Sequence, residues 1–343
     1  MNLKSVKSFI DNKISIHYVI VCMTISSITT FFIASHFGTD KNKPDVEIHA
    51  KNTNCSYNIK RWGGFGYIGP IMFVDNECES ERLASVKQQI STLIENYKHE
   101  GTLNSASVYL KDYATNDWTV INESETFKPG SLLKIPELIT VLKMNELKSG
   151  FLDKELLYEH SYALDKDPKY LSKSIQLGQK YTVKELLTYM IAYSDNCATS
   201  LLMANIDVKL FKKVFTDLGL KSPDMTASDY PITSKEYSYF MRILFNASYL
   251  NIQDSEYATE LLSKCNFKEG IVSSMPSTIK IAHKFGEAGD PLEKQLHETA
   301  IIYLSERPYL ITIMTKGKDL SKLPLVLRQI SSTAYQGMLN LSN

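Results

Sequence analysis

The feature that most constrains the fold of this chain is the separation of its β-type segments into two groups along the sequence. Two short runs rich in Val, Tyr and Thr, at 105–113 and 117–124, flank an Ala-Thr-Asn turn and predict a hairpin. Three further runs of this type lie near the other end of the chain, at 278–287, 298–306 and 308–317. The pattern between the two groups, from about 150 to 265, is mostly helical.

This order predicts an α+β fold, an α/β sandwich in which one antiparallel sheet is built from both ends of the domain and is accompanied by an all-helical subdomain. A helix is expected within 79–101, because its apolar residues recur at helical spacing and a Gly follows them. A long helix is expected after Ser131, and a terminal helix at 322–340. The stretch 61–74, with Gly between aromatic residues, is expected to form loops or a short strand at the domain's edge.

One segment, 14–37, has the character of a membrane span. It contains no Lys, Arg, Asp or Glu, and about 20 apolar residues suffice to cross a bilayer. Lysines dominate the residues before it, so the positive-inside rule places the N-terminus in the cytoplasm. The alternative is a cleaved secretory signal, which has a shorter apolar core and a small-residue cleavage site. We therefore expect a single-pass protein of the cell membrane with these regions: a cytoplasmic N-terminus at 1–13, a transmembrane anchor at 14–37, a linker and edge segment at 38–78, and an extracytoplasmic domain at 79–343.

Charge and cysteine content argue against several kinds of function. The 38 basic and 38 acidic side chains give a net charge of zero, whereas nucleic-acid binding needs a basic surface. The five cysteines lack C-x-x-C spacing and the seven histidines lack metal-ligand spacing, so no metal or other cofactor is expected. Outside the cytoplasm, Cys55 and Cys78 can form a disulfide or remain two free thiols, and the sequence leaves both open. It leaves the oligomeric state open as well.

The stretch 127–134, Phe-Lys-Pro-Gly-Ser-Leu-Leu-Lys, places Ser131 and Lys134 three residues apart at the start of the expected long helix. Residues at this spacing share a helix face, and a Ser hydroxyl needs an adjacent base to act as a nucleophile. A Lys serves as that base when desolvation or a nearby cation lowers its pKa. The alternative is a helix cap with a solvated Lys, and the same spacing recurs at Ser277 and Lys280 without an assigned role.

A second motif is Ser194-Asp195-Asn196, which follows an apolar helical run. A hydroxyl, a carboxylate and an amide in sequence can form a turn that presents side chains into a cleft. Ser194 is a candidate proton relay and Asn196 a candidate contact for a substrate amide, whereas Asp195 is expected to hold the turn. The alternative is an ordinary turn between two helices.

A third motif, His283-Lys284-Phe285-Gly286, lies on one of the expected late strands. Lys284 is a candidate for binding a substrate carboxylate or for ordering the proton relay of Ser194. The alternative is an edge-strand Lys beside a core Phe.

The backbone around this third motif offers further candidates. Gly286 would let a substrate backbone approach closely. The backbone N–H of Glu287 is a candidate second oxyanion donor beside that of Ser131. Since successive side chains of a strand alternate, His283 is expected to point away from the site.

The three motifs in this order and context resemble those of the serine penicillin-recognising enzymes, the class A β-lactamases and related D,D-peptidase domains. The resemblance covers about 80–340 and implies an antiparallel sheet, an all-helical subdomain and an active site between them. It implies that Ser131 is the acylated nucleophile and Lys134 its base partner. It also implies three supporting roles, with Ser194 as proton relay, Asn196 as a substrate contact and Lys284 as the lysine for the relay and the substrate carboxylate.

The sequence departs from the family pattern at two points. Phe285 stands where the family's K-T-G motif has a Thr, so a hydroxyl that would contact the substrate carboxylate is absent. Class A β-lactamases also carry a deacylating Glu in an E-x-x-L-N loop segment, and 197–283 contains no such segment. The acids of the candidate loop at 219–236 are expected to hold a turn or to begin a helix: Asp224, Asp229 and Glu236.

These observations predict a membrane-anchored serine hydrolase acylated at Ser131 by small-molecule β-lactams or by peptidoglycan stem peptides, with β-lactam hydrolysis as the family default. The missing Glu leaves a D,D-peptidase or penicillin-binding protein with slow deacylation as the alternative. A non-catalytic binding domain that keeps the fold is the second alternative. Phe285 and the missing Glu favour that second alternative, and the intact motif residues oppose it.

Overall fold

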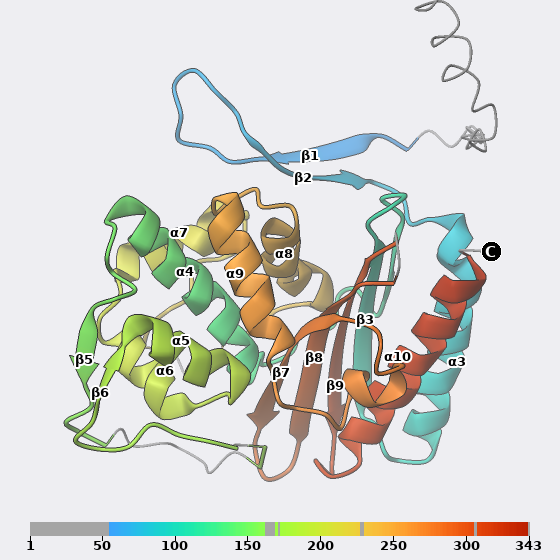
Figure 1. Ribbon diagram of the computed structural model, residues 1–343. Coiled ribbons are helices and arrows are strands. Elements are labelled where there is room, and N and C mark those ends of the chain that lie inside the picture. Colours follow the sequence, from blue (N-terminus) through green and yellow to red (C-terminus); the bar gives the residue numbers. More distant parts are fainter. Residues whose placement is uncertain (1–54, 162–168, 171, 227–229, 305–306, 342–343) are drawn as a thin grey trace, which may run out of the picture. The chain divides into compact units, whose positions relative to one another are not determined.

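The computed structural model describes residues 55–161, 169–170, 172–226, 230–304 and 307–341. Its centre is a five-stranded antiparallel sheet in the order β4-β3-β9-β8-β7 (Figure 1). The strands are β3 (Ser105–Asp112), β4 (Trp118–Ile121), β7 (Ile281–Gly289), β8 (Lys294–Ile302) and β9 (Tyr309–Gly317). Because β3 pairs with β9, the sheet joins the early hairpin to the late strands, which confirms that it is built from both ends of the domain.

Two helices from the ends of the domain pack together on one side of the sheet. These helices, α3 (Ala84–His99) and α10 (Leu323–Asn340), contact each other and lie side by side in Figure 1. Their apolar faces, with Ile90 and Val326 fully buried, share a core with Ile311 of β9. Both expected helices are confirmed, although a short 3₁₀ helix, η1 (Glu81–Leu83), precedes the first of them.

The helical subdomain lies on the other side of the sheet (Figure 1). It contains α4 (Lys134–Leu147), α5 (Val183–Ala192), α6 (Asn196–Met203), α7 (Val208–Asp217), α8 (Ser234–Phe245) and α9 (Ile252–Ser263), with the 3₁₀ helix η2 (Gly130–Leu133) directly before α4. The central helix is α4, whose first ten residues are buried and which contacts α5, α7, α8 and α9. The predicted α+β architecture is therefore confirmed.

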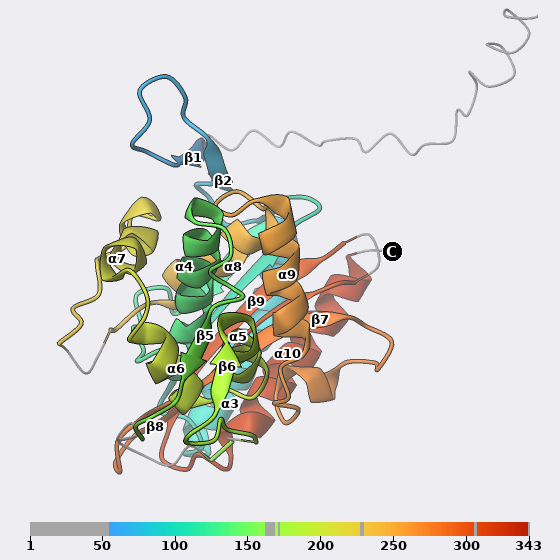
Figure 2. The same ribbon diagram turned by 60° about the vertical axis from the view of Figure 1, so that its left-hand side comes forward.

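A small hairpin interrupts the region predicted to be mostly helical. Strands β5 (Glu155–Leu157) and β6 (Lys180–Thr182) pair with each other, and β6 contacts α5 (Figure 2). The prediction is wrong here because each strand has three residues, too few for a period of two to appear in the sequence. The 3₁₀ helix η3 (Ile271–Ser274) also leads from this helical region into β7.

A second hairpin precedes η1 and fulfils the expectation of a short strand at the domain's edge. Its strands, β1 (Tyr57–Arg61) and β2 (Ile71–Asn76), pair antiparallel. A disulfide between Cys55 and Cys78 joins the ends of the hairpin, with Cα atoms 5.7 Å apart. Of the two alternatives left open by the sequence, the structure contains the disulfide. This bond closes the hairpin at its base.

The segment 14–37, predicted to cross the membrane or, in the alternative, to belong to a cleaved signal, lies outside the described residues. Within the described part of the chain, none of the helices combines the length and apolar character that a bilayer crossing requires.

Candidate active site

Two glycines bring the 3₁₀ helix η2 against strand β7. Gly130 has φ of +55°, and a Cβ atom there would lie 2.2 Å from the carbonyl oxygen of Glu287. A Cβ atom on Gly286 would lie 2.3 Å from the carbonyl oxygen of Pro129. Any larger residue at either position would push the two segments apart. Gly286, expected to make room for a substrate backbone, makes room for the chain's own backbone beside Ser131.

The same contact orients the backbone of Glu287. In an extended strand the N–H and the C=O of one residue point to the same side. Because the carbonyl of Glu287 faces Gly130, its N–H also faces the segment that carries Ser131. The two backbone N–H groups predicted as oxyanion donors therefore come from neighbouring segments. Ser131 itself is partly exposed, and no side-chain hydrogen bond holds its hydroxyl among the described residues.

Lys134 begins α4 and is 3% exposed. Its Nζ donates to the carbonyl oxygen of Ser194 at 2.6 Å and to Asn196 Oδ1 at 2.7 Å, and it lies 3.3 Å from the Ser194 hydroxyl. Burial lowers the pKa of Lys134 well below its usual value, and the positive charge of Lys284 lowers it further. A lysine with such a pKa can exist as a free amine near neutral pH, as a base requires.

Ser194 lies in the turn between α5 and α6 with φ of +56°, a left-handed conformation that is rare for residues other than Gly. Asp195, fully buried, holds this turn as the N-cap of α6. Its carboxylate accepts hydrogen bonds from the hydroxyl of Ser174 at 2.7 Å, from the N–H of Ile175 at 2.9 Å and from the N–H of Cys197 at 3.0 Å. The strained backbone thus presents the Ser194 hydroxyl toward the two lysines.

Lys284 reaches the same hydroxyl from the sheet. Its side chain is fully buried, and its Nζ donates to the Ser194 hydroxyl at 2.8 Å and to the carbonyl oxygen of Phe285 at 3.0 Å. Burial lowers the pKa of Lys284 to about 8. The Ser194 hydroxyl therefore lies between two buried amines, one from α4 and one from β7.

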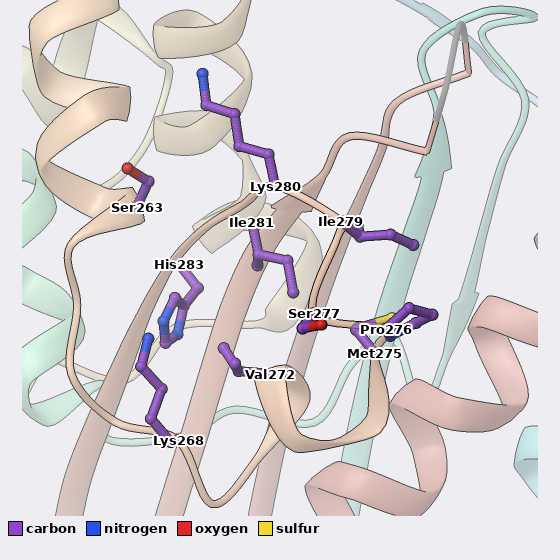
Figure 3. Close-up of a pocket in the computed structure, with 10 residues that line it drawn as sticks. All are labelled: Ser263, Lys268, Val272, Met275, Pro276, Ser277, Ile279, Lys280, Ile281 and His283. Carbon is purple, nitrogen blue, oxygen red and sulfur yellow. The ribbon is translucent and has the colours of Figure 1, made fainter.

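The neighbours of Lys284 on β7 have other roles, although the centroid of the Phe285 ring lies 4.2 Å from Lys284 Nζ. The Phe285 ring is buried and stacks on Phe267, with ring centroids 4.6 Å apart, so it supplies packing where the family pattern has a hydroxyl. His283 pairs with the Glu298 carboxylate at 2.7 Å and points away from the site, as predicted. It lines a cavity of about 320 Å³ together with Lys268 (Figure 3).

The second Ser-x-x-Lys pair of the chain lies at that cavity. Ser277 and Lys280 are among its lining residues (Figure 3). Both residues are exposed, and Lys280 Nζ lies 5.1 Å from the centroid of the Tyr303 ring. This pair therefore lacks the burial and the converging partners that surround Lys134.

The two described acids of the segment before and at the start of α8 have hydrogen-bond partners of their own. Glu236 forms a capping box with Thr233 at the start of α8, as expected. Asp224 is exposed and accepts hydrogen bonds from Thr226. Asp229 lies outside the described residues.

A different acid was missed by the sequence analysis. Glu137 lies in the first turn of α4, three residues after Lys134, and its side chain is buried. Its position three residues after Lys134 could have indicated that the two side chains share a helix face. An acid in a first helical turn is, however, usually exposed to solvent. The described residues contain no cluster of His, Cys, Asp and Glu that could hold a metal ion.

Comparisons with known proteins identify the family of this chain. Residues 85–338 match the model of the beta-lactamase enzyme family. A comparison with curated protein sequences finds no match.

Solved structures share the fold at low sequence identity. PBP-A is 17% identical over 77% of this chain and 99% of its own, with a TM-score of 0.62, and a variant of it is known as an acyl-enzyme complex with penicillin G. A class A β-lactamase from Mycobacterium abscessus is 20% identical over 74% of this chain and 99% of its own, with a TM-score of 0.63. A β-lactamase from Sphaerobacter thermophilus is 17% identical over 73% of this chain and 96% of its own, with a TM-score of 0.64.

The matched residues extend from α3 to α10 and so include the whole sheet and all three motifs. The match covers well over half of the chain. The chain therefore belongs to the beta-lactamase enzyme family, and it is a serine hydrolase of the penicillin-recognising kind that works through an acyl-enzyme.

Proposed function

We propose that this protein catalyses acyl transfer at Ser131 on β-lactams or on the stem peptides of peptidoglycan. The single observation that carries the proposal is the convergence of Lys134 and Lys284 on the hydroxyl of Ser194. A proton taken from Ser131 needs a route to the leaving nitrogen, and a hydroxyl between two amines provides one.

The proposed reaction moves one proton from Ser131 through Lys134 and Ser194 to the leaving nitrogen. The Ser131 oxygen attacks the carbonyl carbon, and its proton passes to the free amine of Lys134. The N–H groups of Ser131 and Glu287 stabilise the negative oxygen that develops. The carbon–nitrogen bond then breaks, and the leaving nitrogen receives a proton from Ser194, which is resupplied from Lys134. Asn196 would contact the substrate amide and Lys284 its carboxylate.

We further propose that this acyl-enzyme is cleared slowly when it forms from a β-lactam. The chain lacks the family's E-x-x-L-N segment, and Asp224 and Glu236 accept hydrogen bonds from Thr226 and Thr233, so neither is proposed to activate water at Ser131. The acyl-enzyme of the PBP-A variant with penicillin G supports penicillin as a ligand for this fold. A penicillin-binding protein or D,D-peptidase is thus favoured over an efficient β-lactamase.

The location of the reaction is also a proposal. The segment 14–37 would anchor the chain in the cell membrane with the domain outside the cytoplasm, next to its peptidoglycan substrate. The Cys55–Cys78 disulfide supports an oxidising compartment for the domain.

Time-resolved intact mass after mixing with penicillin tests the function. We expect an adduct on the wild type that persists, and no adduct on Ser131→Ala. The matched control is Ser277→Ala, which removes the serine of the second Ser-x-x-Lys spacing and should leave the adduct unchanged. Rapid loss of the adduct would instead support a β-lactamase. If no adduct forms and no D-alanine is released from a stem peptide, the proposed function is refuted. The alternative of a non-catalytic binding domain would then be supported.

A further inference from the structure

Glu137 is a buried carboxyl for which the reaction described above has no use. It lies three residues after Lys134, so the two side chains share a face of α4. Only 8% of Glu137 is exposed, against 3% of Lys134. Its Oε2 atom is buried and has no hydrogen-bond partner among the described residues. Native proteins rarely leave a buried carboxylate in this state, because the ionised form needs hydrogen bonds or a close cation.

The charged groups around Glu137 are the two lysines of the site. Lys134 on its own helix and Lys284 on β7 both attract its negative form, but neither forms an ion pair with it within 4 Å in the described structure. From α8, the Tyr237 phenol is near enough to sense its charge, yet its hydroxyl donates to the carbonyl oxygen of Leu132 at 2.8 Å. Burial therefore prevails over the two lysines and raises the pKa of Glu137 to about 8.

Burial acts on Lys134 in the opposite sense. It favours the free amine, the charge of Lys284 favours it too, and the negative forms of Glu137, Asp195 and Cys265 oppose it. When a buried acid and a buried base interact electrostatically, the protonation state of one affects that of the other. Their titrations are then a property of the pair. Without a hydrogen-bonded ion pair, the neutral arrangement avoids the desolvation of two charges.

We propose that Glu137 is a positioning residue for acyl transfer, which holds one proton in common with Lys134 and, by staying neutral, keeps Lys134 available as the base for Ser131. This inference rests on the proposed function. During acylation the proton of Ser131 passes to the free amine of Lys134, while the Glu137 carboxyl keeps its own. The extra proton then leaves with the substrate nitrogen through Ser194, and the neutral pair is restored.

The first test is the pH profile of the acylation rate constant with penicillin, measured for the wild type and for Glu137→Gln. Glutamine has the shape of the protonated carboxyl but cannot ionise, so we expect similar rates at pH 7. Above pH 8 the rates should diverge, because Glu137 then ionises only in the wild type. The pKa of Lys284 lies in the same range, and the Glu137 charge raises it in the wild type alone, so the difference between the two profiles includes the effect of Glu137 on Lys284.

A purely structural role for Glu137 would move the rate by one constant factor at every pH, and two profiles of identical shape would overturn the proposal. Glu137→Asp keeps an ionisable group, so its pH profile should diverge from that of Glu137→Gln as the wild-type profile does. The matched control is Glu236→Gln, which removes an acid of the α8 capping box and should leave the profile unchanged.

The second test does not need activity. Difference infrared spectroscopy should detect a protonated carboxyl at neutral pH in the wild type that is missing from Glu137→Gln. Its absence from the wild type would overturn the proposal even if Ser131 is acylated. Conversely, a protonated carboxyl in a protein that neither forms a penicillin adduct nor releases D-alanine from a stem peptide would refute the proposed function and leave the protonation of Glu137 standing.

Discussion

The Nζ of Lys284 lies 2.8 Å from the hydroxyl oxygen of Ser194, and both side chains are buried. The two residues are 90 positions apart and come from the sheet and the helical subdomain. Their contact therefore closes the site between the two parts of the domain. It also makes the orientation of Ser194 depend on the strand that carries Lys284.

Replacement of Lys284 should slow acylation without removing it. A hydrogen bond to a charged group is worth about 1.5–3 kcal/mol, so Lys284→Met should lower the acylation rate constant by roughly 10- to 100-fold. Penicillin adduct formation followed by stopped-flow or mass spectrometry measures the effect. Lys280→Met, an exposed lysine just ahead of the same strand, is the control and should act as wild type. An unchanged rate in Lys284→Met would show that the Ser194 contact is not used.

The same substitution should change how stability depends on pH. In the unfolded chain Lys284 holds its proton up to about pH 10.5, whereas in the folded protein it loses the proton near pH 8. Between these values the unfolded state binds more protons, so the wild type gains stability as pH rises. The shift corresponds to about 3 kcal/mol. In urea unfolding, Lys284→Met should therefore be more stable than the wild type at pH 7, and this difference should shrink as pH rises above 8.

Asp195 should matter to the reaction through the turn that it holds. Asp195→Ala leaves the Ser174 hydroxyl and two backbone N–H groups without their partner, at a cost of about 2–4 kcal/mol in the free energy of unfolding. It should also slow acylation at least tenfold, because the left-handed conformation of Ser194 loses its support. The control is Asp207→Ala, an exposed N-cap of α7, which should cost about 1 kcal/mol and leave acylation intact.

The sequence predicted those parts of the molecule whose pattern is local. The strand runs at both ends and the apolar spacing of α3 are such patterns, and both appear in the structure. The contacts of Lys134 with Ser194 and Asn196 span about 60 residues, so only the family resemblance could suggest them. Spacing cannot measure a distance across a fold.

The burial of charged side chains could not be predicted from the sequence, because it also depends on contacts between distant parts of the chain. Glu137 in a first helical turn has the pattern of a solvated acid, and Arg242 in a last turn has the pattern of a solvated base. Elements far along the chain cover both: β7 contributes Lys284 beside Glu137, and β2 contributes Asp75 beside Arg242. Such residues become visible only when the elements that cover them are in place.

Arg242 is the largest of the fully buried side chains, and it connects the hairpin of β1 and β2 to the rest of the domain. Its side chain is fully buried, and it binds the Asp75 carboxylate through two nitrogens at 2.6 and 2.8 Å. Its guanidinium carbon also lies 3.9 Å from the centroid of the Phe73 ring. Lys111 reaches the same carboxylate at 3.4 Å, so one Asp compensates two cations.

Asp75→Asn should therefore leave a buried guanidinium without its counter-charge and lower the free energy of unfolding by about 3–5 kcal/mol. Urea unfolding measures the loss, and limited proteolysis in the loop between β1 and β2 reports whether the hairpin detaches first. Glu95→Gln, which breaks an exposed pair with Lys98, should cost under about 1 kcal/mol. Replacing both partners, as Asp75→Leu with Arg242→Met, should recover much of the stability, because no unpaired charge then remains buried. If Asp75→Asn cost no more than Glu95→Gln, apolar packing and not the ion pair would hold the hairpin in place.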